Sequence, residues 1–119
     1  MSFKKWEIYR ANLDPVIGSE QGKSRPVLII SENLINELIN TVNVLPITSR
    51  KFGRQIYPNE ALIEANSFGL DNESIVLSHQ IRTLDKRRLS IKYGKIVDAN
   101  KQNEILESVS FQLGIIQNY

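Results

Sequence analysis

The side chains best suited to chemistry gather in residues 14–26, a loop-like stretch that runs directly into the apolar segment 27–30. This stretch holds two glycines and two prolines, and its polar side chains include Glu20, Gln21, Lys23 and Arg25. Pro26 favours an extended backbone at Arg25, and the four residues after it are typical of a buried strand. The pattern therefore predicts a guanidinium group at a strand edge, beside a mobile loop. Such a group stays charged at neutral pH and binds a phosphate through two parallel hydrogen bonds.

Several common catalytic motifs are absent from the sequence. It has no H-E-x-x-H metal motif, no P-loop, no dinucleotide fingerprint and no clustered set of Asp, Glu and His residues. One histidine and no cysteine exclude a catalytic histidine pair, a thiolate nucleophile and a zinc–thiolate site. We therefore expect no metal and no cofactor. His79 lies in a predicted strand, where both a structural and a catalytic role stay open.

The elements that must position these residues are mostly short strands. Alternation and β-branched composition predict strands over 6–13, 26–30, 41–47, 56–63, 74–83 and 90–97. The first is expected to be half-buried, and Pro46 favours an edge strand or a bulge for the third. Strands in this order, without alternating helices, predict a mainly β, α+β fold built as a compact antiparallel barrel.

Two helices are predicted beside the strands. Ser31 is a candidate N-cap for a short helix whose apolar positions are Leu34, Ile35, Leu38 and Ile39. Asp98 is the candidate N-cap of a C-terminal helix with an apolar stripe at Leu106, Val109 and Leu113, flanked by Ile105 and Ile116. We expect this second helix to cover one end of the barrel.

Length and composition indicate an ordinary globular chain. The 119 residues fit one domain, 1–119, with 41% hydrophobic and 24% charged residues. No apolar run reaches the length of a membrane span, and the N-terminus lacks a signal core, so we expect a cytoplasmic protein. The net charge of +2 is only mildly basic. A fold that gathered the basic residues of three regions would still attract phosphate; these are Lys23, Arg25, Arg50, Lys51, Arg54, Arg82, Lys86, Arg87 and Arg88.

Blocks of residues along nearly the whole chain resemble the MazF/PemK-type toxins, which are ribosome-independent mRNA interferases. They occur in the family's order: Asp14-Pro15, Gly18 to Gly22, Arg25 to Ile29, Pro46 to Ser49, Gly69 to Asp71 with Ser74, Gln80 to Asp85 with Lys86 and Leu89, and Leu113-Gly114. Each block is weak alone, and together they are specific.

The resemblance implies a toxin of a type II toxin–antitoxin system with a compact SH3-like barrel, usually a homodimer. It implies sequence-specific, metal-independent cleavage of single-stranded mRNA, in which the 2′-hydroxyl attacks the adjacent phosphorus and leaves 2′,3′-cyclic phosphate and 5′-hydroxyl ends. It also implies a cognate antitoxin whose disordered, acidic segment folds on the toxin and competes with RNA.

The resemblance further assigns site residues. Arg25 and Thr48 match the family's catalytic positions, and the candidate substrate-binding residues are Glu20, Gln21, Lys23, Ser49, Arg50, Phe52, Gln80 and Arg82. Three roles stay open for Glu20: it orients Arg25, acts as a base, or is an ordinary solvated loop residue. Phe52 is equally suited to cover the core and to stack on an RNA base.

Two other classes of protein stay open at this point. Gyrase-poisoning toxins share a related barrel and cleave nothing, and a non-catalytic RNA-binding barrel would keep the basic loops. The nuclease reading is favoured because both catalytic positions are filled.

Overall fold

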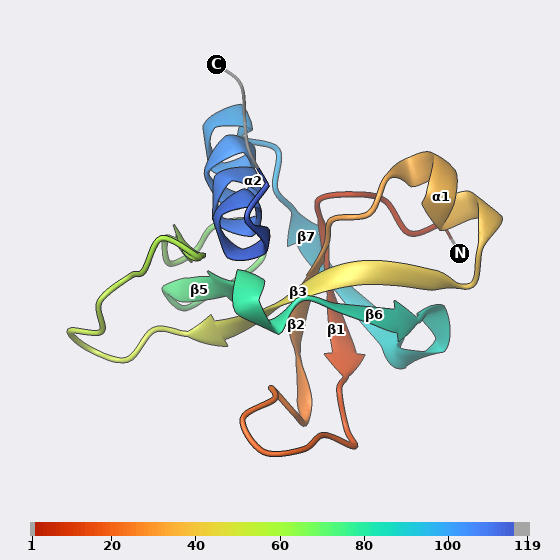
Figure 1. Ribbon diagram of the computed structural model, residues 1–119, viewed down its shortest axis with the longest axis horizontal. Coiled ribbons are helices and arrows are strands. Elements are labelled where there is room, and N and C mark those ends of the chain that lie inside the picture. Colours follow the sequence, from red (N-terminus) through yellow and green to blue (C-terminus); the bar gives the residue numbers. More distant parts are fainter. Residues whose placement is uncertain (1, 116–119) are drawn as a thin grey trace.

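The computed structural model describes residues 2–115. Seven antiparallel strands and two helices follow one another in the chain (Figure 1): β1 Glu7–Asn12, β2 Ser24–Ile29, α1 Asn33–Leu38, β3 Thr41–Ser49, β4 Glu60–Ile63, β5 Ser74–Leu77, β6 Arg82–Asp85, β7 Leu89–Lys95 and α2 Ala99–Leu113. Two 3₁₀ turns, η1 Ser78–Gln80 and η2 Lys86–Arg88, flank β6. The predicted mainly β fold with a C-terminal helix is confirmed. The strands form an open sheet, whose order in residues 2–115 runs β4-β5-β3-β2-β1-β7 with β6 added on β3.

Strand β3 is the centre of the sheet and is paired along both edges. One edge joins β2, and the other joins β6 through residue 44 and β5 from residue 47 onward. The prediction that Pro46 marks an edge strand is therefore wrong. The proline is tolerated because residues 45 and 46 fall between the β6 and β5 pairings, where one side of β3 has no ladder.

The middle of the sheet is buried on both faces. Alternate residues of the central strands enter two separate hydrophobic clusters, so that Tyr9 and Val27 belong to one and Ile8 and Leu28 to the other. The predicted half-buried first strand is confirmed for its second half, where Arg10 and Asn12 are exposed, whereas its first three residues are buried on both faces. The period-2 pattern is obeyed, because each face receives alternate side chains.

Helix α2 covers the second cluster, although not along the predicted stripe. Ile105 is fully buried and Val109 packs beside it, whereas Leu113 is exposed. Ile116 lies outside the described residues. Asp98 is the N-cap as expected, since its carboxylate accepts hydrogen bonds from the backbone N–H groups of residues 100 and 101.

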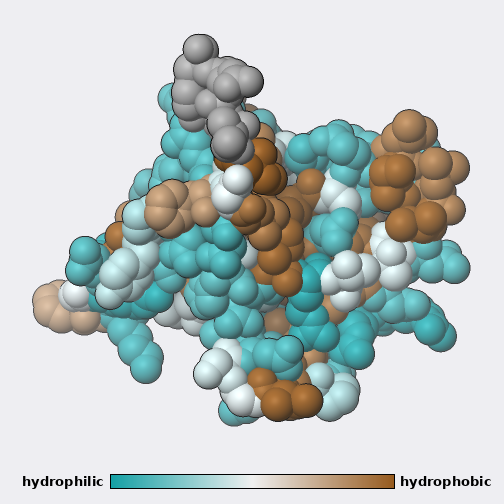
Figure 2. Space-filling model, viewed as in Figure 1, coloured by the Kyte–Doolittle hydropathy of each residue, from teal (hydrophilic) through white to brown (hydrophobic). Residues whose placement is uncertain are grey.

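Helix α1 differs from its prediction at both its cap and its faces. The N-cap is Glu32, and Ser31 instead donates its hydroxyl to the Asn36 side chain, the buried residue of this helix. The four aliphatic side chains are exposed and form a hydrophobic patch in Figure 2: Leu34, Ile35, Leu38 and Ile39. No helix in residues 2–115 is long and apolar enough to cross a membrane.

Two predicted strands are shorter than expected because turns interrupt them. Residues 56–59 form a turn before β4, and the Tyr57 N–H donates to Glu60 Oε1 at 3.0 Å. The segment 74–83 is divided by η1 into β5 and the start of β6. These breaks turn the chain toward the site described below.

A buried ion pair fixes the long β3–β4 connection. Arg54 Nη2 lies 2.6 Å from Glu60 Oε2 and Nη1 lies 2.9 Å from Oε1, while the Glu60 side chain is 2% exposed. The Arg54 hydrogen bonds hold the pKa of Glu60 below its ordinary value of 4.5, although burial acts in the opposite direction. The connection is therefore stabilised most when Glu60 is ionised.

We expect Glu60→Gln to lower the free energy of unfolding at pH 7 by about 2 kcal/mol, because charged hydrogen bonds to Arg54 are lost. A depressed pKa contributes stability above the unfolded-state value of 4.5 and loses it as the pH falls through the folded-state value. Urea unfolding should therefore show that the difference in free energy of unfolding between the wild type and Glu60→Gln shrinks as the pH falls below about 5. Glu107→Gln, at an exposed α2 position, is the control, and a difference that stayed constant down to about pH 2.5 would contradict this role for Glu60.

Candidate functional site

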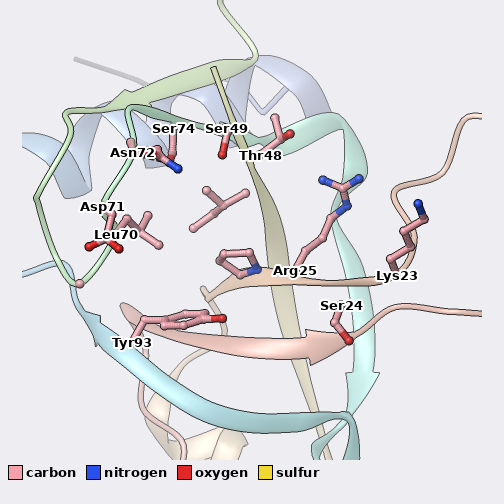
Figure 3. Close-up of a pocket in the computed structure, with 13 residues that line it drawn as sticks. Lys23, Ser24, Arg25, Thr48, Ser49, Leu70, Asp71, Asn72, Ser74 and Tyr93 are labelled. Atoms are coloured by element: carbon pink, nitrogen blue, oxygen red, sulfur yellow. Dashed lines mark hydrogen bonds between the residues drawn. The ribbon is translucent and has the colours of Figure 1, made fainter. Parts of the chain in front are cut away.

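One hollow of the surface lies where β2 begins and β3 ends. Its volume is about 480 Å³. We call it the Arg25 hollow, and it is lined by Lys23, Ser24, Arg25, Pro26, Ile47, Thr48, Ser49, Gly69, Leu70, Asp71, Asn72, Ser74 and Tyr93 (Figure 3). Four predicted site residues therefore share one site: Arg25, Thr48, Lys23 and Ser49.

The pairing of β2 with β3 brings Arg25 and Thr48 together. The β2–β3 pairing ends with Val27 opposite Pro46, and Arg25 and Thr48 each lie two residues beyond this pair on their own strands. Residues two apart in a strand share a face, and both side chains therefore lie on the same side of the sheet. Figure 3 shows them reaching toward the same side of the hollow.

The guanidinium of Arg25 is held by one nitrogen and is available through the other two. Its Nε donates to the carbonyl of Gly22 at 2.9 Å. Within residues 2–115 its terminal nitrogens have no hydrogen-bond or ion-pair partner. Two parallel donors thus face the hollow with their direction already set, which suits a phosphate oxygen pair.

Hydroxyl groups line the side of the hollow formed by β3 and β5. Thr48 and Ser49 stand opposite Ile75 and Ser74 in the β3–β5 ladder. Ser74 donates its hydroxyl to the Asn72 carbonyl at 2.8 Å. Thr48 and Ser49 have no side-chain hydrogen bond within the described residues, so both can donate to an anion in the hollow.

The β1–β2 loop is fastened to η1 and to the start of β6. The side chain of Gln80, in η1, accepts a hydrogen bond from the Gln21 N–H at 3.1 Å and donates one to the Ser19 carbonyl at 3.1 Å. Arg82 adds a bond from Nη1 to the Leu13 carbonyl at 3.0 Å. Gln80 and Arg82 thus hold the loop in place, and their contact with substrate stays a prediction.

The same loop closes tightly at its base, next to Arg25. Asp14 Oδ1 accepts from the Lys23 N–H at 2.8 Å, and the Leu13 N–H donates to the Lys23 carbonyl at 2.8 Å. A Cβ on Gly22 would lie 2.7 Å from Asp14 Oδ1, so only glycine fits between these contacts. The Gly22 carbonyl that orients Arg25 is therefore fixed from both sides.

Other candidate residues lie outside the Arg25 hollow. Glu20 accepts a hydrogen bond from the Ile17 N–H at 2.6 Å and lines a separate depression of about 380 Å³ with His79. The two candidate bases are thus not among the residues around Arg25. Arg50 pairs with Glu73 at 3.0 Å. Phe52 is fully exposed, so its interpretation as a cover for the core is wrong, while its stacking on RNA stays a prediction.

Most of the basic residues are engaged inside the protein. Carboxylates pair with Arg50, Arg54 and Arg87, and backbone carbonyls accept from Arg82, Lys86 and Arg88. Of the nine basic residues that the sequence singles out, two line the Arg25 hollow, so the fold does not gather all of them at this site. Positive charge in the Arg25 hollow comes from Lys23 and Arg25, against one carboxylate, Asp71.

Five polar residues of the hollow are missing from the sequence-based site: Ser24, Asp71, Asn72, Ser74 and Tyr93. Asp71 and Ser74 belong to a block that resembled the family without suggesting a role, and Asn72 lies between them. Tyr93 comes from β7, far along the chain, and no local pattern connects it with Arg25. Contacts of this kind arise from tertiary packing alone.

A small antiparallel sheet with an arginine and free hydroxyls in one hollow defines a β-rich protein with a site suited to a phosphate group. Comparison with known families identifies the family to which the chain belongs. The family model described as PemK-like, MazF-like toxin of type II toxin–antitoxin system matches residues 4–113, and the chain belongs to this family.

Individual relatives agree with this assignment. The chain is similar to Endoribonuclease MazF of Staphylococcus saprophyticus, with 39% identity over 112 residues that cover 94% of this chain and 92% of the relative. It is also similar to Endoribonuclease EndoA of Bacillus subtilis, with 35% identity over 116 residues and 98% of each chain covered.

Solved structures of MazF from Deinococcus radiodurans have the same fold. One structure of MazF matches with a TM-score of 0.80 and 28% identity, covering 97% of this chain and 99% of that chain. A MazE–MazF structure matches with a TM-score of 0.73 and 26% identity, covering 98% and 99%.

We expect Gln80→Ala to loosen the β1–β2 loop while leaving the fold intact, since it removes two hydrogen bonds between the loop and η1. A hydrogen bond contributes about 1 kcal/mol, so exchange of the Gln21 amide proton should accelerate by roughly fivefold or more. His79→Ala, at the exposed neighbouring position, is the control. Equal exchange at Gln21 in the wild type and Gln80→Ala would show that Gln80 does not fasten the loop.

Proposed function

We propose that the chain, residues 1–119, is one toxin domain that acts in the cytoplasm and cuts single-stranded mRNA at specific sequences. The observation that carries the proposal is that Arg25, with two free guanidinium nitrogens, and Thr48, with a free hydroxyl, line the same hollow. The names of its relatives, Endoribonuclease MazF and Endoribonuclease EndoA, support this activity.

The reaction uses the substrate's own nucleophile. The RNA 2′-oxygen attacks the adjacent phosphorus, the bond from phosphorus to the 5′-oxygen breaks, and a 2′,3′-cyclic phosphate forms. The proton lost from the 2′-hydroxyl is balanced by the proton gained by the leaving 5′-oxygen. The balanced reaction contains no water, metal ion or cofactor as a reactant.

Arg25 and Thr48 have different roles at the phosphate. Negative charge grows on the phosphate oxygens during the attack, and the Arg25 guanidinium neutralises it through two parallel hydrogen bonds. The Thr48 hydroxyl donates to another phosphate oxygen and fixes the direction of attack. Lys23 and Ser49 contribute charge and a further donor at the rim of the same hollow.

The arrangement suits an unpaired strand. In-line attack requires a sugar–phosphate unit that can rotate, and reading of the sequence requires bases that are free of a duplex. The hollow of about 480 Å³ is proposed to hold one splayed nucleotide. Glu20, Gln21, Arg50, Phe52, Gln80 and Arg82 are proposed to contact RNA farther from the cut, or to hold the loops that do.

A cognate antitoxin is the proposed protein partner, and the toxin is proposed to act as a homodimer. MazF of Deinococcus radiodurans was solved together with MazE, which supports such a partner here. An acidic segment seated over Arg25 and Lys23 would occupy the phosphate position and block RNA by direct competition.

Arg25→Ala should reduce the rate of RNA cleavage by about 10² to 10³, because a preorganised donor to the transition-state charge is lost. The measurement uses a long single-stranded RNA in excess EDTA, followed by mapping of the cut sites and their end groups. The wild type should cut at a recurring short sequence and leave cyclic phosphate ends. Arg25→Lys should restore only a small part of the rate, since an ammonium group cannot form the parallel pair of bonds.

Lys51→Ala is the matched control, because Lys51 is an exposed cation outside the Arg25 hollow. Circular dichroism checks that each variant is folded. A folded wild type that leaves RNA intact would overturn the nuclease proposal, and full activity of Arg25→Ala would remove Arg25 from the mechanism.

A further inference from the structure

The wall of the hollow that lies across from Arg25 differs chemically from the cationic side. It is formed by Asp71 and Asn72, from the loop before β5, and by Tyr93 of β7 (Figure 3). A carboxylate repels phosphate, so this wall is unsuited to the group that Arg25 attracts. It offers an aromatic ring with hydrogen-bonding groups beside it, which is the chemistry that recognises a nucleobase.

These three side chains are available to a ligand. Within residues 2–115, the carboxylate of Asp71, the amide of Asn72 and the hydroxyl of Tyr93 have no hydrogen-bond or ion-pair partner. Tyr93 is 37% exposed, and its ring points into the hollow in Figure 3. The wall thus combines a stacking surface with unused donors and acceptors.

The wall is also rigid, because two glycines let the 67–70 segment pack directly on β7. A Cβ on Gly69 would lie 1.9 Å from the Tyr93 carbonyl oxygen, and a Cβ on Gly94 would lie 2.1 Å from that of Phe68. The backbone of residues 68 and 69 therefore packs directly on the backbone of Tyr93 and Gly94. Asp71, two residues after Gly69, is held at a set position relative to the ring.

We propose that this wall is a base-recognition subsite for the nucleotide next to the scissile phosphate, and that Asp71 makes it selective for a base with an exocyclic amine. The inference rests on the proposed function, since it assumes that the phosphate lies at Arg25. Tyr93 stacks on the base, and Asp71 accepts hydrogen bonds from the base edge, with Asn72 beside it.

Elementary base chemistry sets the selectivity. Adenine, cytosine and guanine each present an amine that donates to a carboxylate, and guanine adds a second, adjacent N–H donor. Uracil presents a single N–H between two carbonyl oxygens, which repel the carboxylate on both sides. The subsite therefore discriminates against uracil at one position beside the cut.

The first test maps the cut sites of the wild type and Asp71→Asn on a long RNA of mixed sequence. We expect the wild type to exclude uracil at one position adjacent to the cut, and Asp71→Asn to weaken this preference about tenfold at that position alone. Glu64→Gln, at an exposed acid outside the hollow, should leave the preference unchanged. An unaltered preference in Asp71→Asn, or an equal loss of cleavage at every sequence, would overturn the proposal, because the latter would make Asp71 part of the reaction or the fold.

Tyr93 provides a second readout. Tyr93→Ala should weaken RNA binding about tenfold for all preferred sequences, and Tyr93→Phe should restore it, since stacking needs the ring and not the hydroxyl. Tyr57→Ala is the control for loss of an exposed tyrosine outside the hollow. Failure of Tyr93→Phe to restore binding would contradict the stacking role.

A binding measurement separates this proposal from the nuclease proposal. The four nucleoside 3′-monophosphates are titrated into the wild type and Asp71→Asn, and binding is followed by the resonances of residues 69–72. We expect the uracil nucleotide to bind several-fold more weakly than the other three, and Asp71→Asn to remove this difference. Equal binding of all four to the wild type would overturn the subsite even if RNA is cleaved, and the expected order would support it even if RNA is not.

Discussion

The site depends on the register between β2 and β3. Because Val27 pairs with Pro46, the first residues of β2 and the last residues of β3 lie beyond the same end of this pairing, where Arg25 and Thr48 line one hollow. A shift of one residue would move one of the two side chains to the other face and separate them. The two hydrophobic clusters prevent such a shift, since alternate residues of these strands are buried on opposite faces.

Several arginines of this toxin order its loops. Arg50 and Arg54 pair with carboxylates at the β3–β4 connection, and Arg82 and Arg88 donate to carbonyls of the β1–β2 connection. Arg25 is tied by Nε alone, and its orientation comes from a glycine carbonyl in a loop fastened by Gln80. In the proposed mechanism, a small number of oriented donors, rather than a strong overall charge, distinguishes the scissile phosphate from the rest of the RNA backbone.

The sequence predicted much of the fold and the cationic half of the site, for identifiable reasons. Strand periodicity located β1, β2, β3 and β7, and the Arg25-Pro26 step next to an apolar run placed the guanidinium at a strand end. The partners of Gln80 and Arg82 and the place of Tyr93 depend on packing between distant segments, which local patterns do not encode. The cap at Ser31 and the edge assignment of Pro46 failed because a buried Asn36 and a gap in the β3 ladder override local preference.

The most direct measurement of the central claim is a structure of the toxin with a single-stranded RNA that carries a 2′-O-methyl group at the cleavage position. The methyl group blocks the attacking oxygen and keeps the substrate whole. We predict one phosphate in the Arg25 hollow, within hydrogen-bond distance of both terminal nitrogens of Arg25 and of the Thr48 hydroxyl. RNA bound elsewhere on the protein, with no phosphate in this hollow, would contradict the account.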